Sequence, residues 1–281
     1  MRRPSERGGP FRFPAIMLRR IGDVTIESIA GESAKFAAPM VLVHGLWCSA
    51  AVWRRFMGYL AHRGWTCHAM NLRGHGDAAG RDEVDRFSFA DYLGDVQSVL
   101  AACDAAPVVV GHDLGGLLAL ACPAATTRAV VALAPFLPRT IGGTTNPVLS
   151  SWSARLALLR SCPLPPPHGR LGAAYFGDGA PGGATAESAR AAHELRDGAF
   201  DLPAQIGRPT LLVAGERDRF SRPDAVERWG RRLGVQYRTI EGAGHAMPWG
   251  AGWEVCVAAT HRWLIQALGE PLLLLRDEQE E

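Results

Sequence analysis

The sequence predicts an α/β protein in which helices cover both faces of a mostly parallel sheet. Short apolar runs alternate with longer amphipathic stretches along most of the chain, and this alternation is typical of strand–helix units. One run, residues 107–110, is almost pure valine, as expected for a strand buried on both faces. A glycine-rich hexapeptide, residues 111–116, follows this run directly and opens an apolar helical pattern.

The individual elements follow from the same patterns. Strands are expected, in chain order, at residues 40–43, 66–70, 107–110, 129–133, 210–213 and 235–239. Helices are expected at residues 50–63, from Ser88 onward, at 117–122 and at 253–268. Ser88 and Asp91 form a capping-box pattern at the start of the second helix, and Tyr92, Val96 and Leu100 give that helix an apolar face.

One long segment, residues 138–205, breaks this rhythm because it holds no convincing strand. It carries helical patterns at residues 150–160, with Trp152, Leu156 and Leu159 as the apolar face, and at residues 184–197. Insertions of this length between strands usually serve a function. We interpret the segment as a small helical lid, with a disordered linker as the alternative.

The remaining boundaries follow from composition. Residues 1–18 are rich in Arg, Pro and Gly and are expected to be a disordered leader. Residues 19–137 and 206–270 would form the two parts of one core. Residues 271–281 end in a run of acidic side chains and are expected to be a flexible tail.

Overall composition limits the partners of the chain. Apolar residues make up 47% and charged residues 21% of its 281 residues, with a net charge of +2, so we expect neither wholesale disorder nor nucleic-acid binding. The six cysteines form no CxxC pair, so we expect no zinc site, and nothing implies another metal or an organic cofactor. The sequence shows neither the apolar stretch of a signal peptide nor the ~18 apolar residues of a membrane span. We therefore expect a cytoplasmic protein with no membrane partner, and a homo-oligomer stays open.

The sharpest motif is the hexapeptide GHDLGG at residues 111–116. A strand before it and an apolar helix after it are the context of a nucleophile elbow. Glycines flank the central residue because the turn is strained and neighbouring backbones pack closely. The turn raises one side chain above the sheet, and here that side chain is the carboxylate of Asp113.

Further motifs follow the remaining predicted strands. His44-Gly45 follows the first strong strand, RGHG at 73–76 the second, GERD at 215–218 a late strand, and GAGH at 242–245 the last. Together with the elbow these motifs resemble those of α/β-hydrolases, over about residues 19–269. The resemblance implies the α/β-hydrolase fold with a small helical lid. It also implies catalytic roles for Asp113, Asp218 and His245, in the family's order of nucleophile, acid and histidine.

The aspartate at the elbow narrows the resemblance to the Asp-nucleophile branch, which comprises epoxide hydrolases and haloalkane or haloacid dehalogenases. A carboxylate needs no activating base; on an acyl substrate it would give an anhydride, whereas at an sp3 carbon it gives a stable alkyl ester. By this analogy Asp113 attacks carbon, and His245, oriented by Asp218, deprotonates the water that hydrolyses the ester. The backbone N–H groups of Leu46 and Leu114 would hold the resulting oxyanion.

Within this branch, epoxide opening is the preferred reaction. It needs an acid, which the family takes from lid tyrosines, typically a pair; Tyr175 is the one tyrosine within residues 138–205 and is the candidate acid. The family's epoxide hydrolases carry proline where this chain has Trp47. Dehalogenases depend on side-chain N–H donors for the departing halide. Leu46 and Leu114 stand where such donors are usual, and a leucine side chain offers none.

A pocket for a small hydrophobic substrate completes the prediction. Its expected walls are Trp47, Trp152, Phe176 and Trp249. Three functions besides epoxide opening stay open: a haloalkane or haloacid dehalogenase, an ester or lactone hydrolase, and a catalytically silent relative that binds a ligand. Asp113 could also mark a Ser→Asp change at the elbow of a serine enzyme.

Overall fold

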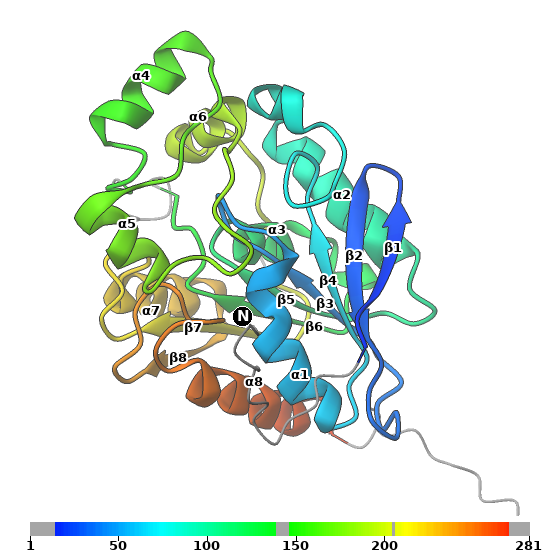
Figure 1. The fold of residues 1–281 in the computed structure, drawn as a ribbon. Coiled ribbons are helices and arrows are strands. Elements are labelled where there is room, and N and C mark those ends of the chain that lie inside the picture. The colour runs from blue at the N-terminus through cyan, green and yellow to red at the C-terminus, as the bar shows by residue number, and fades with distance from the viewer. Residues whose placement is uncertain (1–14, 139–145, 204–205, 270–281) are drawn as a thin grey trace, which may run out of the picture.

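The centre of the protein is an eight-stranded sheet (Figure 1). The computed structural model describes residues 15–138, 146–203 and 206–269. The strands are β1 (Met17–Ile21), β2 (Val24–Ile29), β3 (Met40–Val43), β4 (Cys67–Asn71), β5 (Val108–His112), β6 (Ala129–Leu133), β7 (Thr210–Gly215) and β8 (Gln236–Ile240). Their order is β1-β2-β4-β3-β5-β6-β7-β8. Neighbours in the run β4-β3-β5-β6-β7-β8 pair in parallel, whereas the pairs β1–β2 and β2–β4 are antiparallel.

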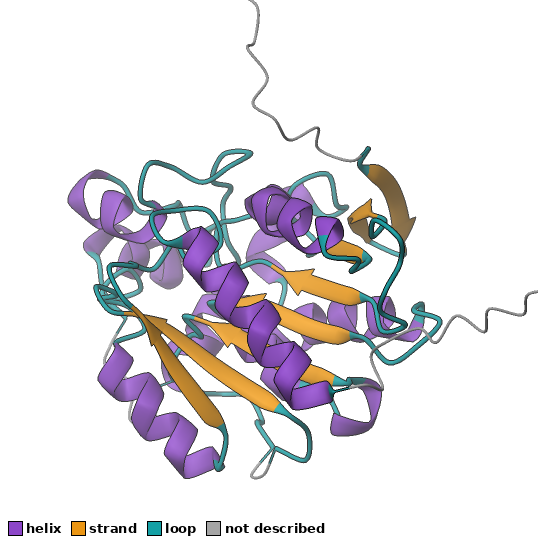
Figure 2. Cartoon of the chain, turned by 90° about the horizontal axis from the view of Figure 1, so that it is seen from below, coloured by secondary structure: helices purple, strands orange, loops and turns teal. Residues whose placement is uncertain are grey.

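Helices cover both faces of this sheet (Figure 2). They are α1 (Arg54–His62), α2 (Phe89–Ala101), α3 (Leu114–Ala121), α4 (Trp152–Arg160), α5 (Gly169–Phe176), α6 (Ala189–Asp197), α7 (Pro223–Leu233) and α8 (Trp253–Leu268). Helices α1 and α8 pack together on one face, and α2 and α3 pack together on the other. In the described ranges no helix is long and apolar enough to cross a membrane.

The valine-rich strand β5 lies in the middle of the sheet. Val110 pairs with Leu42 of β3 on one side and with Val131 of β6 on the other. All three side chains are fully buried, which explains why this strand has no polar alternation. The burial of β5 fixes the position of Asp113, the residue that follows it.

Helices α4, α5 and α6 gather at one end of the sheet (Figure 1). They belong to the inserted segment, a name used here for residues 146–203. Ser151 and Ser188 cap α4 and α6 through their side-chain oxygens, as expected of N-cap serines. A backbone bridge between Leu164 and Glu187 joins the two arms of the segment.

Most predicted elements are confirmed. The strands lie within two residues of their expected ends, α8 has its expected bounds, and Ser88 caps α2 with the predicted capping box. The β1–β2 hairpin was not expected. It corrects the predicted leader, because Met17 and Leu18 pair with Ser28 and Glu27 across the turn at Gly22. Residues 1–14, 139–145, 204–205 and 270–281 lie outside the described residues, and with them most of the predicted leader and all of the predicted tail.

The inserted segment differs from its predicted helices in two respects. Helix α6 begins at Ala189, five residues later than residue 184, because Glu187 pairs with Leu164 in a β-bridge and Ser188 caps the helix. The apolar face expected for α4 is wrong. Leu159 is 83% exposed and Trp152 79% exposed, and the buried face holds Ala154, Ala157 and Leu158 instead.

A first prediction follows from the close packing at the elbow glycines. A Cβ on Gly115 would lie 2.2 Å from the carbonyl oxygen of Val43 in β3. Because this neighbour is backbone, Gly115→Ala is expected to lower the free energy of unfolding by about 3 kcal/mol or more, measured by urea denaturation.

Gly94→Ala is the matched control, since Gly94 lies inside α2 with nothing within 4 Å of its added Cβ. This variant should be more stable than the wild type by about 0.8 kcal/mol. Equal stabilities for the two variants would contradict the close approach of α3 to β3.

Candidate active site

Asp113 occupies a strained turn between β5 and α3. Its backbone has φ 51° and ψ −114°, a conformation that a residue with a side chain rarely adopts. Three hydrogen bonds hold it there: its N–H donates to Leu133 O at 3.0 Å, and its carbonyl accepts from Leu117 N at 3.2 Å and from Phe136 N at 3.0 Å. The side chain therefore has one fixed direction and is almost fully buried.

Asp218 and His245 come from loops that follow β7 and β8 and meet Asp113 above the sheet. His245 Nδ1 donates to Asp218 Oδ2 at 2.9 Å, and His245 Nε2 lies 3.9 Å from Asp113 Oδ1. The second oxygen of Asp218 accepts the N–H groups of Phe220 and Ser221, at 2.7 and 3.0 Å. The structure thus brings the three predicted residues together, with the Nε2 atom of His245 facing the elbow carboxylate.

The charges of this cluster shift its pKa values. Burial alone would lower the pKa of His245, but the Asp218 carboxylate outweighs it and raises that pKa above its usual value. Burial would raise the pKa of Asp218, yet His245 and two backbone N–H groups lower it. Burial raises the pKa of Asp113, and His245, Tyr175 and the Leu46 and Leu114 N–H groups oppose this rise. Asp218 and His245 thus favour each other's charge, whereas burial disfavours the charge of Asp113.

The Oδ2 atom of Asp113 has its own set of donors. The backbone N–H of Leu46 donates to it at 3.1 Å, and the hydroxyl of Tyr175 donates to it at 2.5 Å. Leu46 can come this close because Gly45 precedes it: a Cβ on Gly45 would lie 2.7 Å from Asp113 Cβ. One carboxylate oxygen is thus held by donors, and the second faces His245.

Tyr175 is fully buried on α5 and lies over the catalytic histidine candidate. Its ring centroid is 4.4 Å from that of His245 and 5.0 Å from that of Phe220. Burial and the negative charge of Asp113 raise the pKa of Tyr175 well above its usual value. The hydroxyl therefore keeps its proton at neutral pH and can act as a neutral donor.

Three of the four predicted pocket walls surround this cluster. Trp47 and Phe176 make edge contacts with the ring of Tyr175, at 5.3 and 4.9 Å. Trp249 packs edge-on against His112 at 5.3 Å. Trp152 is the exception and is corrected here, because it lies exposed on the outer side of α4, in a surface depression with Arg155 and His193.

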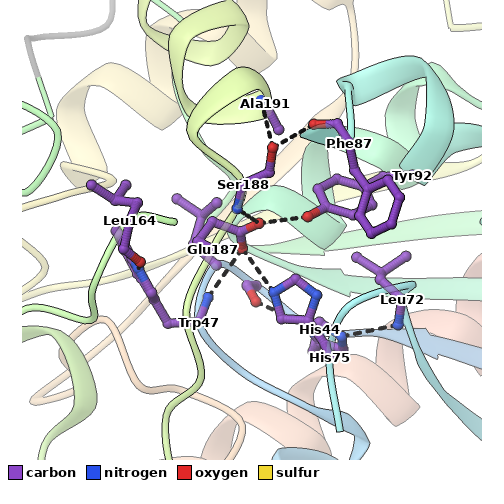
Figure 3. A network of polar contacts seen from close by, with 12 residues as sticks. His44, Trp47, Leu72, His75, Phe87, Tyr92, Leu164, Glu187, Ser188 and Ala191 are labelled. Atoms are coloured by element: carbon purple, nitrogen blue, oxygen red, sulfur yellow. Dashed lines mark hydrogen bonds and ion pairs between the residues drawn. The ribbon is translucent and has the colours of Figure 1, made fainter. Parts of the chain in front are cut away.

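Two residues near the site were missed in the sequence. Phe220 packs against both Tyr175 and His245; a lone aromatic in the charged loop after Asp218 was an available signal. Glu187 is fully buried beside Trp47 (Figure 3). An acidic residue just before a helix is ordinarily an exposed partner of the helix dipole, so no local pattern marked Glu187. Among the described residues, no group of three or more His, Cys, Asp or Glu is arranged to hold a metal ion.

Comparison with known proteins agrees with this architecture. Residues 40–259 match the family model described as "Alpha/beta hydrolase family". The chain therefore belongs to the alpha/beta hydrolase family. A comparison with curated proteins gives no match.

Solved structures with a similar fold include three hydrolytic enzymes. A monoacylglycerol lipase from Paleococcus ferrophilus is 22% identical, with a TM-score of 0.65 over 83% of this chain and 98% of the lipase. E-2-(acetamidomethylene)succinate hydrolase is 22% identical, with a TM-score of 0.61 over 89% and 99%. A thermophilic esterase from Thermogutta terrifontis is 18% identical, with a TM-score of 0.61 over 90% and 99%. At these identities the likeness concerns the fold.

A second prediction concerns the effect of Asp218 on the pKa of His245. Asp218→Asn removes the charge that raises the pKa of His245, so burial should dominate and the pKa of His245 should fall. Histidine titration by NMR measures this change. Asp224→Asn is the control, because Asp224 pairs with Arg222 and Arg228 on the surface and should leave His245 unchanged. An identical His245 titration in Asp218→Asn and the wild type would contradict the ion pair.

Proposed function

We propose that this hydrolase acts through a covalent alkyl ester on Asp113 and opens the epoxide ring of a hydrophobic substrate to a diol. The observation that carries the proposal is the hydrogen bond from the neutral Tyr175 hydroxyl to the Asp113 carboxylate, within contact of His245. It puts a nucleophile, an acid and a base in one buried cluster, and epoxide hydrolysis needs all three.

The first step uses Asp113 and Tyr175. Asp113 Oδ1, the oxygen that faces His245, attacks a ring carbon and forms the C–O bond of the ester while the ring C–O bond breaks. The departing alkoxide takes the proton of Tyr175. The raised pKa of this phenol keeps the proton available until a strongly basic oxygen develops.

The second step uses His245 and the backbone N–H donors of the Asp113 carboxylate. His245 Nε2 takes a proton from water, which attacks the ester carbonyl, and the oxyanion forms on Oδ2, to which the Leu46 N–H donates. The Leu114 N–H also donates to the Asp113 carboxylate. One such donor is worth about 3–4 kcal/mol in hydrolases of known mechanism. Collapse of the intermediate releases the diol, which takes the proton of His245.

The proton balance also fits the observed contact. Hydrolysis leaves Asp113 as a carboxylic acid and Tyr175 as a phenolate. Because the two groups are hydrogen-bonded at 2.5 Å, the proton of Asp113 can return directly to Tyr175. The resting state is then restored with one water consumed for each epoxide opened.

The surroundings favour an epoxide over a halide. A halide leaving group needs N–H donors, and indole N–H groups are the usual source. The indole N–H of Trp47 donates to Leu164 O at 3.1 Å, and that of Trp249 to Phe176 O at 3.0 Å. Since both donors are already used by backbone carbonyls, dehalogenation is the second choice.

Acyl hydrolysis is less favoured by this site. The similar lipase and esterase structures keep acyl chemistry in view. Against it, attack of Asp113 on an acyl carbon would form an anhydride, which offers no stable intermediate.

The inserted segment acts as a lid in this proposal. Asp113, Tyr175 and His245 are each at most 1% exposed, so a substrate can reach them only if residues of the inserted segment move aside. Trp47, Phe176 and Trp249 then form apolar walls, which suits a hydrophobic substrate.

A trapping experiment tests the ester. His245→Gln should leave Asp113 able to attack but remove the base that activates water, so the ester should accumulate on exposure to epoxides. Intact-protein mass spectrometry should show the added mass of the whole epoxide, and peptide mapping should place it on Asp113. The double variant Asp113→Asn/His245→Gln is the control and should stay unmodified.

The same experiment includes haloalkanes and haloacids. An adduct only from these compounds, lighter than the substrate by the hydrogen halide, would reassign the protein to dehalogenation. Failure of a folded His245→Gln variant to form any adduct would contradict the ester mechanism and favour acyl hydrolysis or silent binding.

The role of Tyr175 makes a separate prediction. In the His245→Gln background, Tyr175→Phe should slow adduct formation from an epoxide by about 100-fold, because the alkoxide loses its acid. Tyr237→Phe changes an exposed tyrosine of β8 and should leave the rate unchanged. Equal rates in the Tyr175 and Tyr237 variants would contradict general acid catalysis by Tyr175.

A further inference from the structure

Trp47 lies beside the donor of the candidate oxyanion hole and has a strained backbone. It follows Leu46, whose N–H contacts Asp113, and its φ is +60°. A bulky residue in this left-handed region is costly and persists only where its surroundings hold it. The direction of the Leu46 N–H therefore depends on what holds Trp47.

The inserted segment holds Trp47 by every polar group that this residue has. The backbone N–H donates to Glu187 Oε2 at 3.2 Å, the backbone carbonyl accepts from Thr185 N at 2.9 Å, and the indole N–H donates to Leu164 O. Leu164 and Glu187 are joined by two backbone hydrogen bonds of 2.8 and 2.9 Å. The three partners of Trp47 are here called the Trp47 clamp: Leu164, Thr185 and Glu187.

Glu187 is the charged centre of this clamp (Figure 3). Besides Trp47 N–H, its carboxylate accepts from His75 Nε2 at 3.1 Å, from the Tyr92 hydroxyl at 2.7 Å and from Ser188 N at 2.7 Å. The side chains of Glu187 and His75 are fully buried. Burial opposes both charges, but each group stabilises its partner, so the pKa of Glu187 is lowered and that of His75 is raised.

The core holds the opposite side of the same loop. His44 accepts from Leu72 N–H through Nε2 at 3.2 Å, so its proton lies on Nδ1, which donates to Gly45 O at 2.8 Å. Burial and the nearby His75 lower the pKa of His44 to about 3, so the ring stays neutral. Gly45 and Leu46 are thus anchored to the core, whereas Trp47 is anchored to the inserted segment.

We propose that closure of the inserted segment assembles the oxyanion hole, with Glu187 as the positioning residue that couples the two. When the segment lifts, Trp47 loses its partners, its left-handed backbone relaxes, and the Leu46 N–H turns away from Asp113. The hole is complete only when the segment is closed over the substrate. This inference rests on the proposed function for its chemistry, but the coupling itself is a property of the folded chain.

Hydrogen–deuterium exchange tests the coupling without any substrate. Glu187→Gln keeps the shape of the side chain but removes the charge that faces Trp47 N–H and His75. Exchange in peptides covering residues 44–50 should rise about tenfold, the usual effect of losing a hydrogen bond to a charged group.

The chain offers a matched control. Glu194 also belongs to the inserted segment and accepts a core N–H, that of Phe89, at 2.7 Å, but no contact links it to Trp47. Glu194→Gln should leave exchange at residues 44–50 unchanged. If a folded Glu187→Gln variant shows the same exchange there as Glu194→Gln, the proposal is overturned.

A milder variant covers the case in which Glu187→Gln does not fold. Tyr92→Phe removes one donor to Glu187 Oε1 and leaves the contact between Glu187 and His75 Nε2 intact. It should raise exchange at residues 44–50 in the same direction by a smaller factor. No rise in Tyr92→Phe, when Glu187→Gln is unfolded, would also overturn the proposal.

A kinetic readout separates positioning from general damage. The oxyanion hole serves the second step, so in single-turnover reactions with an epoxide Glu187→Gln should slow ester hydrolysis about tenfold or more and slow ester formation much less. Equal slowing of both steps would overturn the assignment. If His245→Gln forms no ester, the proposed function fails, whereas increased exchange in Glu187→Gln still supports the coupling.

Discussion

The burial of the Asp113 carboxylate is the constraint on which the rest of the site depends. An ionised group removed from water must find hydrogen bonds and opposite charge. The strained turn after β5 aims this carboxylate away from the sheet, and the sheet itself offers it nothing. Besides the N–H of the adjacent Leu114, its partners come from elsewhere: Leu46 from the loop after β3, Tyr175 from the inserted segment and His245 from the loop after β8. These three segments meet because the carboxyl ends of parallel strands share one edge.

Two buried histidine–carboxylate pairs stabilise this region, and both respond to pH. The pKa values of His75 and His245 are raised above their ordinary 6.5, so their contribution to stability is full below pH 6.5 and is lost as pH rises through the raised values. The pKa values of Glu187 and Asp218 are lowered from 4.5 and 3.8. The contribution of these two carboxylates to stability is therefore full above those values and is lost as pH falls through the lowered values. Together the pairs contribute fully between about pH 4.5 and 6.5.

Sequence patterns predicted the core well because each signal there was local. The valine run, the capping box at Ser88 and the motifs at strand ends each depend on neighbours along the chain, and strand order then brought Asp113, Asp218 and His245 together. Helix α4 was different. Its spacing predicted an apolar face with Trp152, but this side chain lies outward because the small residues Ala154 and Ala157 allow the closer packing. Glu187 could not be found at all, since its partners His75 and Tyr92 are about a hundred residues away in sequence.

The inserted segment has a consequence for how this fold can be re-engineered. This one stretch of chain supplies the Tyr175 hydroxyl that contacts Asp113 and the three groups that contact Trp47. One of these groups, the Glu187 carboxylate, is in turn bound by His75 and Tyr92 of the core. The segment is therefore not an exchangeable cassette for altering specificity. A graft from another hydrolase would bring new walls but leave the buried His75 ring and a left-handed tryptophan without partners. Core and graft would have to be redesigned together, with positions 47, 75 and 92 changed to suit the incoming segment.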